Sequence, residues 1–249
     1  MRDSVDVHGV MIDNITMSEA VNRLLSFLDE EKNHTVYTPN SEIIMKAHRD
    51  ADLKNTLNAS DMLVADGAGV VLASKILGNR LTEKVSGIDL VKNLFSYTFK
   101  KEISFFFLGG KNGVAQEAKE KVCDLYPGVK VTGCNDGYFS PEQEKDIIDK
   151  INSSNADILL VGLGAPKQEK WIHKNKENLK VKVCIGIGGA LDVFAGRAKL
   201  APDFFRRNGL EWLYRLYKEP WRFKRMLDLP KLVILSLAVR MGIRKNPKL

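Results

Sequence analysis

The sequence is short of the residues that hold small domains together through covalent bonds or metal ions. Only three of its 249 residues are cysteines, Cys123, Cys134 and Cys184, an odd number without short spacing. This pattern excludes a disulfide framework and predicts reduced, buried thiols in a cytoplasmic protein. The four histidines never approach one another at ligand spacing, so no zinc site is expected. A chain of this length, with 44% hydrophobic residues, can bury a sizeable core without disulfide bonds or a structural metal ion.

Long hydrophobic runs are missing as well. The first thirty residues contain six acidic side chains and no apolar segment of the kind found in secretory signals. The longest apolar run near the C-terminus covers residues 232–239, which as a helix would span about 12 Å, whereas the hydrocarbon core of a bilayer is about 30 Å thick. The sequence therefore predicts that the chain does not cross a membrane.

Excess positive charge is absent from most of the chain and concentrated at its end. Residues 196–249 carry 14 Lys and Arg against 4 Asp and Glu, a net charge of +10. The other 195 residues carry 24 basic and 27 acidic side chains, a net charge of −3. This division predicts an ordinary folded core in residues 1–195 and a basic, aromatic appendage in residues 196–249 that meets a polyanion or an anionic membrane surface.

Short apolar, β-rich runs alternate with amphipathic stretches in the core. The expected strands are residues 34–38, 62–65, 103–108, 129–133, 158–162 and 181–187. The expected helices cover residues 17–31, 41–58, 68–77, 87–100, 112–125, 141–154 and 167–178. Continuous apolar strands between helices are typical of a parallel sheet buried on both faces. The predicted fold is α/β, a doubly wound, Rossmann-like, mostly parallel sheet with helices on both faces and a short basic C-terminal helical appendage.

The appendage is expected to form three short helices separated by Pro220 and Pro230, because proline is tolerated in a first helical turn. The third segment, residues 231–241, is apolar nearly all round, with basic residues at both ends. Such a segment favours an anionic membrane surface over nucleic acid as the partner. It can equally dock on the chain's own core or on a second copy, which leaves a homo-oligomer open.

Glycine or polar residues follow every expected strand. Ligands of open parallel sheets bind outside the carboxyl ends of the strands, so these loops are expected to line one long cleft. Glycine permits close backbone approach and helix N-termini favour anions, which favours a nucleotide site over the alternative that tight turns simply require glycine. The loops lack the spacing of a dinucleotide fingerprint and of a Walker A motif, which weakens NAD and ATP-hydrolysis interpretations. The candidate nucleotide-binding residues are Asn40, Gly109, Gly110, Tyr138, Gly164, Lys167, Gln168, Gly188, Gly189 and Asp192.

Two acidic positions are candidates for chemistry. Asp66 directly follows an expected strand in a tight Asp-Gly turn, where its carboxylate can accept a proton from a substrate hydroxyl. The alternative, an N-cap for the helix at residues 68–77, is equally consistent with its position. Asp50-Ala51-Asp52 matches the Asp-x-Asp metal signature of many nucleotide-sugar transferases, but it lies within an expected helix. A solvated helix face or a cap is the favoured interpretation there, and no metal site is predicted.

These motifs together resemble those of the WecG/TagA/CpsF family of bacterial glycosyltransferases, and most of all its TagA branch. The resemblance extends from His8 to Leu229. It rests on Thr38-Pro39-Asn40-x-Glu42, Asp66-Gly67-x-Gly69, Val85-x-Gly87-x-Asp89, Gly137-Tyr138-Phe139, Gly162-x-Gly164-Ala165-Pro166-Lys167-Gln168-Glu169, Gly188-Gly189-x-x-Asp192 and Gly209-Leu210-Glu211-Trp212.

The resemblance implies an inverting glycosyltransferase that needs neither a metal nor another cofactor. The TagA branch transfers N-acetylmannosamine from UDP-N-acetylmannosamine to undecaprenyl-diphosphate-N-acetylglucosamine, the committed step toward wall teichoic acid linkage. By similarity, Asp66 is the candidate general base, and Thr38, Asn40 and Gln168 shape the substrate pocket.

The resemblance also assigns roles to basic residues. The family carries a basic residue just before the Val85 motif, often arginine; here it is Lys84, which keeps the charge but loses the bidentate fork. The family's tail brings arginines onto the core and toward the membrane, and Arg215, Arg222 and Arg225 stand at the matching positions. The implied location is the cytoplasmic face of the cell membrane, as a peripheral protein.

The implied reaction is coherent with these residues. A carboxylate draws the proton from the acceptor's 4-hydroxyl as that oxygen attacks the anomeric carbon, which inverts to a β-1,4 linkage. The departing UDP gains negative charge, for which backbone amides and tail arginines are the available donors. Two alternatives stay open: another donor such as UDP-N-acetylmannosaminuronic acid, as in the WecG branch, or a non-catalytic nucleotide-binding membrane adaptor.

Overall fold

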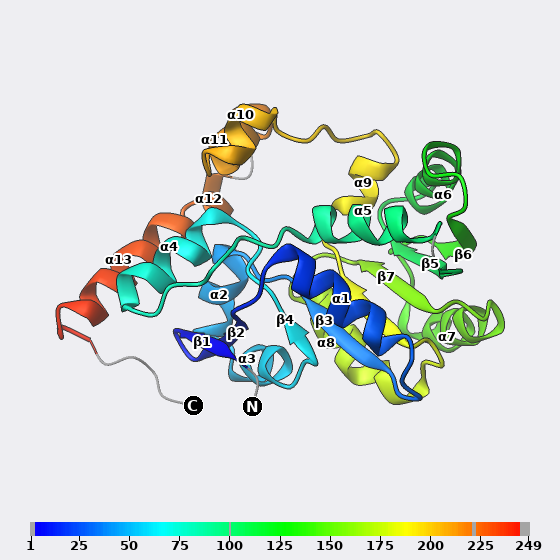
Figure 1. The fold of residues 1–249 in the computed structure, drawn as a ribbon, viewed down its shortest axis with the longest axis horizontal. Coiled ribbons are helices and arrows are strands. Elements are labelled where there is room, and N and C mark those ends of the chain that lie inside the picture. Colours follow the sequence, from blue (N-terminus) through cyan, green and yellow to red (C-terminus); the bar gives the residue numbers. More distant parts are fainter. Residues whose placement is uncertain (1–2, 100, 221–222, 245–249) are drawn as a thin grey trace.

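A six-stranded parallel sheet forms the centre of the computed structural model, which describes residues 3–99, 101–220 and 223–244 (Figure 1). The strand order is β4-β3-β8-β7-β5-β6. The α/β prediction, with a parallel sheet between helices, is confirmed. The strands are β3 (His34–Tyr37), β4 (Met62–Leu63), β5 (Ser104–Gly109), β6 (Lys130–Asn135), β7 (Ile158–Gly162) and β8 (Val183–Gly186).

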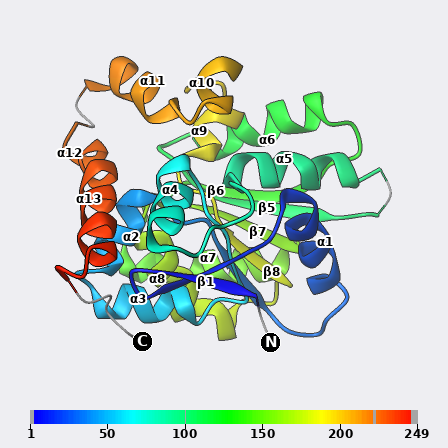
Figure 2. The same ribbon diagram turned by 60° about the vertical axis from the view of Figure 1, so that its left-hand side comes forward.

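Helices cover both faces of the sheet (Figure 2). Side chains of one strand alternate between the two cores: Phe105 and Phe107 point into one, while Phe106 and Leu108 point into the other. The first core is covered by α1 (Met17–Phe27), α5 (Gly87–Tyr97), α6 (Val114–Leu125) and α9 (Ala190–Phe194). The second is covered by α2 (Ser41–Ala47), α3 (Ala51–Asn58), α7 (Glu144–Ser153) and α8 (Lys167–Asn175), with the short 3₁₀ turns η1 (Pro141–Gln143) and η2 (Lys176–Asn178) at the edges of α7 and α8.

The winding of the sheet reverses between β5 and β7. The chain leaves β5 through α6 on one face toward β6, and leaves β7 through α8 on the opposite face toward β8. Helices that diverge in this way leave a crevice at the carboxyl ends of the two strands, which is where open α/β sheets bind ligands.

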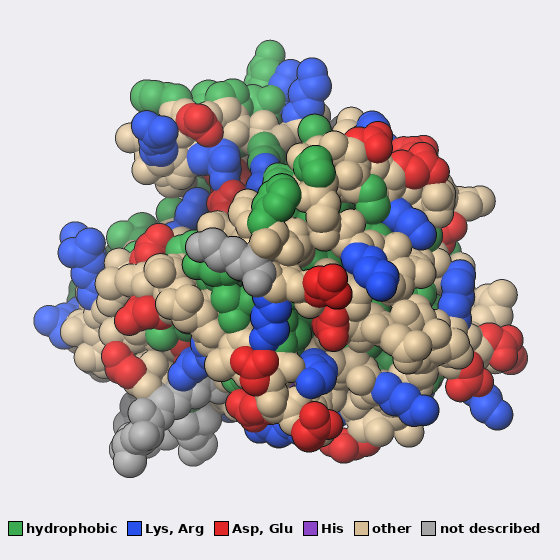
Figure 3. Space-filling model, turned by 45° about the vertical axis from the view of Figure 1, so that its right-hand side comes forward, with side chains coloured by type: hydrophobic (Ala, Val, Ile, Leu, Met, Phe, Trp, Pro, Cys, Tyr) green, Lys and Arg blue, Asp and Glu red, His purple; other side chains and the backbone are tan. Residues whose placement is uncertain are grey.

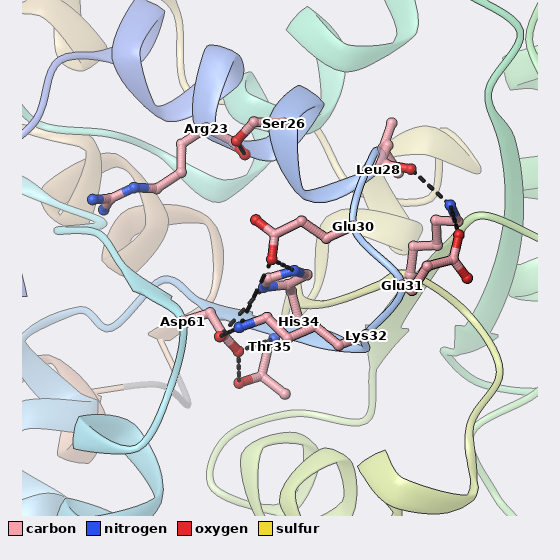
Figure 4. A network of polar contacts seen from close by, with 10 residues as sticks. Arg23, Ser26, Leu28, Glu30, Glu31, Lys32, His34, Thr35 and Asp61 are labelled. Carbon is pink, nitrogen blue, oxygen red and sulfur yellow. Dashed lines mark hydrogen bonds and ion pairs between the residues drawn. The ribbon is translucent and has the colours of Figure 1, made fainter.

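The opposite, amino end of the sheet holds a separate polar network around His34 (Figure 4). The buried His34 ring stacks on Phe27 with 3.9 Å between ring centroids. Glu30 Oε2 lies 3.1 Å from Nε2, and Asp61 Oδ1 lies 3.3 Å from Nδ1. Asp61 also accepts a hydrogen bond from the Thr35 backbone N–H at 2.9 Å, so the network fixes the start of β3.

Three local features differ from the expectations. A β-hairpin of β1 (Ser4–Val7) and β2 (Val10–Asp13) precedes the sheet, and its short strands were not predicted. The single helix expected at residues 41–58 is two helices, because Asp50 caps α3: its Oδ1 accepts a hydrogen bond from the Leu53 backbone N–H at 3.0 Å. Cysteine burial was also only partly right: all three cysteines are free thiols, but Cys123 and Cys134 are half-buried and Cys184 alone is buried.

The C-terminal part forms four helices within its described residues, one more than expected. These are α10 (Asp203–Arg207), α11 (Glu211–Lys218), α12 (Phe223–Met226) and α13 (Asp228–Arg240). The first three form a lobe beside α4 (Ala68–Leu77), and α13 lies along α4 and α2 (Figure 1). Leu232 and Leu235 are the buried apolar side chains of α13. In the part of the chain that the structure describes, no helix is long and apolar enough to span a bilayer.

Candidate active site

Asp66 stands at the carboxyl end of the sheet, between the end of β4 and the start of α4. Its backbone N–H donates to the Pro39 carbonyl at 3.0 Å, which ties the turn to the loop after β3. Its carboxylate accepts a hydrogen bond from the backbone N–H of Gly87, in the first turn of α5. The N-cap of α4 is Gly67, so the interpretation of Asp66 as a cap is wrong.

The environment of Asp66 favours its protonated form more than water does. Burial is the largest influence and raises the pKa of this carboxyl group from 3.8 to about 6. Arg215 and Lys84 act in the opposite direction, and Glu211 adds to the rise. A carboxylate with such a pKa is ionised at neutral pH yet more basic than an exposed one, which suits a general base.

Three charged groups of the site come from distant parts of the chain. Lys84 Nζ lies 3.8 Å from Glu211 Oε2, and Arg215 Nη2 donates to Glu211 Oε1 at 2.7 Å. Glu211 and Arg215 both belong to α11, so the C-terminal lobe brings an acid and an arginine to Asp66.

Arg225, another arginine predicted from the tail, connects the lobe to the core. Arg225 Nε donates to Glu42 Oε2 at 2.9 Å, which joins α12 to the first turn of α2. Glu42 in turn contacts Lys46 Nζ at 2.7 Å, and Lys46 donates to the Ala165 carbonyl at 3.1 Å. Arg222 lies outside the described residues.

Thr38 and Asn40, which follow β3, are both engaged with the backbone. The Thr38 hydroxyl donates to the Gly186 carbonyl at 3.4 Å and so joins the ends of β3 and β8. Asn40 is the N-cap of α2, and its Oδ1 accepts from the Ile43 backbone N–H at 3.1 Å. The loop that carries both residues therefore has a fixed shape beside Asp66.

Gln168 is buried behind the ends of β7 and β8. Its Oε1 accepts from the Gly188 backbone N–H at 3.0 Å, and its Nε2 donates to Glu169 Oε1 at 2.8 Å. Burial raises the pKa of the Glu169 carboxyl group. Because both ends of the Gln168 amide have partners, its orientation is set and the loop after β8 is held in place.

The predicted glycines gather at the crevice between β5 and β7. Gly109 has φ +144°, and a Cβ there would lie 2.4 Å from the Gly162 carbonyl oxygen, so only glycine fits. The Gly110 N–H donates to the same carbonyl at 3.2 Å. Added Cβ atoms at Gly164 and Gly188 would meet no described atom within 4 Å, so backbone is open to a ligand there.

The remaining candidates flank this crevice. Tyr138 is 78% exposed and lines a hollow of about 420 Å³ beside the end of β6, together with Asp136. Lys167 lies over the Phe139 ring, 5.2 Å from its centroid. Gly189 is the N-cap of α9, and Asp192 lies in the first turn of that helix. The glycine loops, Tyr138 and Asp192 thus share one edge of the sheet with Asp66.

Asp50 has a structural role that its Asp-x-Asp signature does not reveal. Besides capping α3, its carboxylate contacts Lys170 Nζ at 2.6 Å. The interpretation as a cap is confirmed. Within residues 3–99, 101–220 and 223–244, no group of three or more His, Cys, Asp or Glu side chains is arranged to hold a metal ion.

The roles of three acidic residues that join the lobe to the core were not predicted from the sequence. Glu42, Asp89 and Glu211 all lie in the motifs that carry the family resemblance, yet no task was assigned to them. Each forms an ion pair between the core and the C-terminal helices. The available signal was their position in the motifs, but the partners depend on how the chain folds back.

Comparisons with known proteins agree on one family. Residues 5–246 match the profile of the glycosyl transferase WecG/TagA/CpsF family. The chain is 36% identical over 233 residues to the N-acetylglucosaminyldiphosphoundecaprenol N-acetyl-beta-D-mannosaminyltransferase of Bacillus subtilis (strain 168), covering 93% of this chain and 90% of the relative. It is 38% identical over 208 residues to the protein of the same name from Bacillus spizizenii, covering 84% and 80%. A Staphylococcus aureus (strain MRSA252) protein of that name is 33% identical over 228 residues, covering 91% and 89%. The chain belongs to the WecG/TagA/CpsF family of glycosyltransferases.

Proposed function

We propose that this protein transfers N-acetylmannosamine from UDP-N-acetylmannosamine to the 4-hydroxyl of undecaprenyl-diphosphate-N-acetylglucosamine, an early step of wall teichoic acid linkage. The names of its Bacillus and Staphylococcus relatives support this donor and acceptor. The observation that carries the proposal is the placement of Asp66: a carboxylate with a pKa of about 6, at the carboxyl edge of the sheet, with Lys84 and Arg215 beside it.

In this reaction Asp66 is the general base. Its carboxylate accepts the proton of the acceptor's 4-hydroxyl while that oxygen attacks the anomeric carbon from the face opposite UDP, which gives a β-linkage. Gly87 steadies the ionised carboxylate through its backbone N–H. Thr38, Asn40 and Gln168 hold the loops that shape the sugar pocket.

In this proposal the departing UDP is held by the glycine loops and by arginines of the lobe. We assign its diphosphate to the glycine loops after β5, β7 and β8, where open backbone and the start of α8 favour anions. Tyr138 and Asp192 flank the nucleoside side of this crevice. Arg215, Arg225 and Arg222 are proposed to approach the diphosphate groups from the lobe, because guanidinium groups match phosphate oxygens.

The proposed mechanism uses no metal ion, since Asp50 caps a helix and pairs with Lys170. Turnover is therefore expected to survive EDTA. Loss of turnover that magnesium or manganese restores would contradict this and would indicate that Asp50 and Asp52 bind the metal ion.

The lobe and α13 are proposed to meet the anionic cytoplasmic face of the membrane, where the lipid acceptor resides. Basic and apolar side chains lie close together on the lobe, which projects at the top of Figure 3. Its exposed apolar side chains are Phe204, Leu213, Tyr217 and Phe223. Each Lys or Arg near an anionic surface adds about 1 kcal/mol of attraction, so a few suffice for reversible attachment.

One assay separates this function from its alternatives. The protein is incubated with a lipid-diphosphate N-acetylglucosamine analogue and either UDP-N-acetylmannosamine or UDP-N-acetylmannosaminuronic acid, and UDP release is measured. Acceptor-dependent release with the first donor is expected. Release with the uronic acid donor alone would indicate the specificity of the WecG branch, and release with neither would indicate a non-catalytic nucleotide-binding adaptor.

A further inference from the structure

Three acidic residues of the motifs neither accept nor donate a proton in the reaction proposed above. Asp89 lies in the first turn of α5, Glu42 in the first turn of α2, and Glu211 opens α11. All three form ion pairs across the boundary between the core and the C-terminal helices. These ion pairs therefore hold the lobe against the core.

The ion pair between Asp89 and Arg206 is the closest of these. Arg206 Nη2 donates to both carboxylate oxygens of Asp89, at 2.5 and 2.6 Å. The two side chains are 27% and 23% exposed, whereas the Arg225 side chain in the pair with Glu42 is 52% exposed. Water and salt screen such a partly buried pair less than an exposed one, and the pair joins α10 to the first turn of α5.

Fixing α10 also fixes the residues beside Asp66. The turn between α10 and α11 contains Gly209 in a left-handed conformation, with φ +70°, and a Cβ there would lie 2.9 Å from Ala68 Cβ. Ala68 is two residues after Asp66, so this turn rests on the start of α4. The next residues of the lobe are those of α11, which carries Glu211 and Arg215 to the Asp66 carboxylate.

We propose that Asp89 is a positioning residue, which holds α10 and α11 closed over Asp66 through its ion pair with Arg206. This inference rests on the proposed function in one respect, namely that Asp66 is the base. Docking of the lobe is a property of the fold alone, so it can be measured without any turnover.

The first test measures docking in the full chain. Hydrogen–deuterium exchange of residues 203–218 is compared in the wild type, Asp89→Asn, Arg206→Gln and the charge swap Asp89→Lys with Arg206→Glu. Exchange is expected to become faster in both single variants and to return toward the wild type in the swap. Arg207→Gln is the matched control, because Arg207 is exposed and forms no ion pair among the described residues, and its exchange is expected to stay unchanged.

The second test measures positioning with a short-chain, water-soluble acceptor. Asp89→Asn is expected to lower kcat by about 10- to 100-fold, the size of effect that a small misplacement of catalytic groups can have. UDP should still bind, since the glycine loops are untouched. An open lobe relieves the burial of Asp66 and removes Glu211, two changes that lower the pKa of Asp66, and it removes Arg215, a change that raises this pKa. Because burial is the largest influence, the acidic limb of the pH profile should move to lower pH. A purely structural role for Asp89 would not move it.

The outcomes separate the two proposals. Unchanged exchange in Asp89→Asn, or a swap that fails to restore protection, would show that this ion pair does not dock the lobe. Faster exchange with unchanged turnover and pH profile would show that docking does not position the catalytic groups. Absence of turnover in the wild type would refute the proposed function, while the exchange experiment would still decide the role of Asp89 in docking.

Discussion

The carboxylate of Asp66 is held between burial, which disfavours its charge, and the cations Lys84 and Arg215, which favour it. Since the proposed general base must be ionised to accept a proton, turnover is expected to depend on this balance. We expect kcat/KM of the wild type to fall as the pH drops through about 6, and to be level above it until another group titrates. The measurement is a pH profile of UDP release on a soluble acceptor. A limb near pH 4 would show that Asp66 titrates like an exposed carboxylate.

Replacement of the same residue tests its role directly. Asp66→Asn keeps the shape of the side chain but removes the basic oxygen, so turnover is expected to fall by at least about 100-fold. UDP affinity should be nearly unchanged, because the glycine loops lie on other strands. Near-normal turnover in the folded variant would exclude Asp66 as the base.

For a single residue such as Asp66, the sequence predicts its place in the fold better than it predicts its neighbours. The place of Asp66 after a buried strand was predictable, because an apolar run ends directly before it. Its neighbours Glu211 and Arg215 were not, since they come from a helix at the far end of the chain. A cap at Asp50 was favoured over a metal ligand, but it could not be distinguished from a solvated helix face, because the sequence does not show that its carboxylate meets the Leu53 backbone N–H.

Among the secondary-structure elements, the strands of the parallel sheet could be predicted from the sequence, whereas the short strands of the N-terminal hairpin could not. All six parallel strands overlap the predicted ones, and β4, β5, β7 and β8 consist mainly of apolar residues that the sheet buries on both faces. The hairpin of β1 and β2 was missed because its strands have only four residues each and each contains an acidic residue, Asp6 in β1 and Asp13 in β2. Its stability comes from tertiary contacts, such as the hydrogen bond from the Leu63 backbone N–H to Asp13 Oδ2 at 2.8 Å, which no local pattern shows.

The hairpin also holds α13 through a buried hydrogen bond. His8 Nε2 lies 2.8 Å from Ser236 Oγ. Because the Ser236 hydroxyl donates to the Leu232 carbonyl at 2.8 Å, it accepts from His8. Burial, with a smaller effect of His48, lowers the pKa of His8 to about 4, so the ring is neutral at pH 7.

Loss of this contact should weaken the docking of α13. Ser236→Ala leaves a buried His8 nitrogen without its partner, so the free energy of unfolding is expected to fall by about 1–3 kcal/mol. Urea unfolding at pH 7 measures it. Ser153→Ala is the matched control, because Ser153 makes the same type of hydrogen bond to the carbonyl four residues earlier but is exposed. Equal effects of the two substitutions would show that the contact with His8 adds nothing.

Over the whole molecule, charge and hydropathy predicted that the C-terminus differs from the core but not how it is arranged. The segment that is apolar all round was expected to meet lipid, a second copy or the core. The structure places Leu232 and Leu235 against the core and leaves Ile234 and Met241 exposed, each to 65%. One helix thus has a docked face and a free face, a division that hydropathy alone cannot predict because both faces are apolar.

We expect the lobe to complete the active site as well as to bind the membrane. Reversing the charge of Arg225 tests its part in the active site. Arg225→Glu turns the contact with Glu42 into a repulsion and removes a cation from the proposed diphosphate site, so turnover on a soluble acceptor is expected to fall. Lys224→Glu changes the neighbouring charge equally, and Lys224 forms no ion pair within the described part of the chain, so it should have little effect on that acceptor. Equal turnover in the two variants would remove Arg225 from the site.

Truncation before Phe204 tests both tasks of the C-terminal helices at once. It removes Glu211 and Arg215 from Asp66, and it removes the basic and apolar side chains proposed to meet lipid, so turnover and binding to anionic liposomes should both be lost. The parallel sheet and its glycine loops remain, so UDP should still bind. Stability should decrease, because Leu232 and Leu235 no longer cover α4 and α2. A truncated chain that binds UDP and keeps full turnover on a water-soluble acceptor would show that these helices are only an anchor, and Arg215 and Arg225 would then leave the catalytic site.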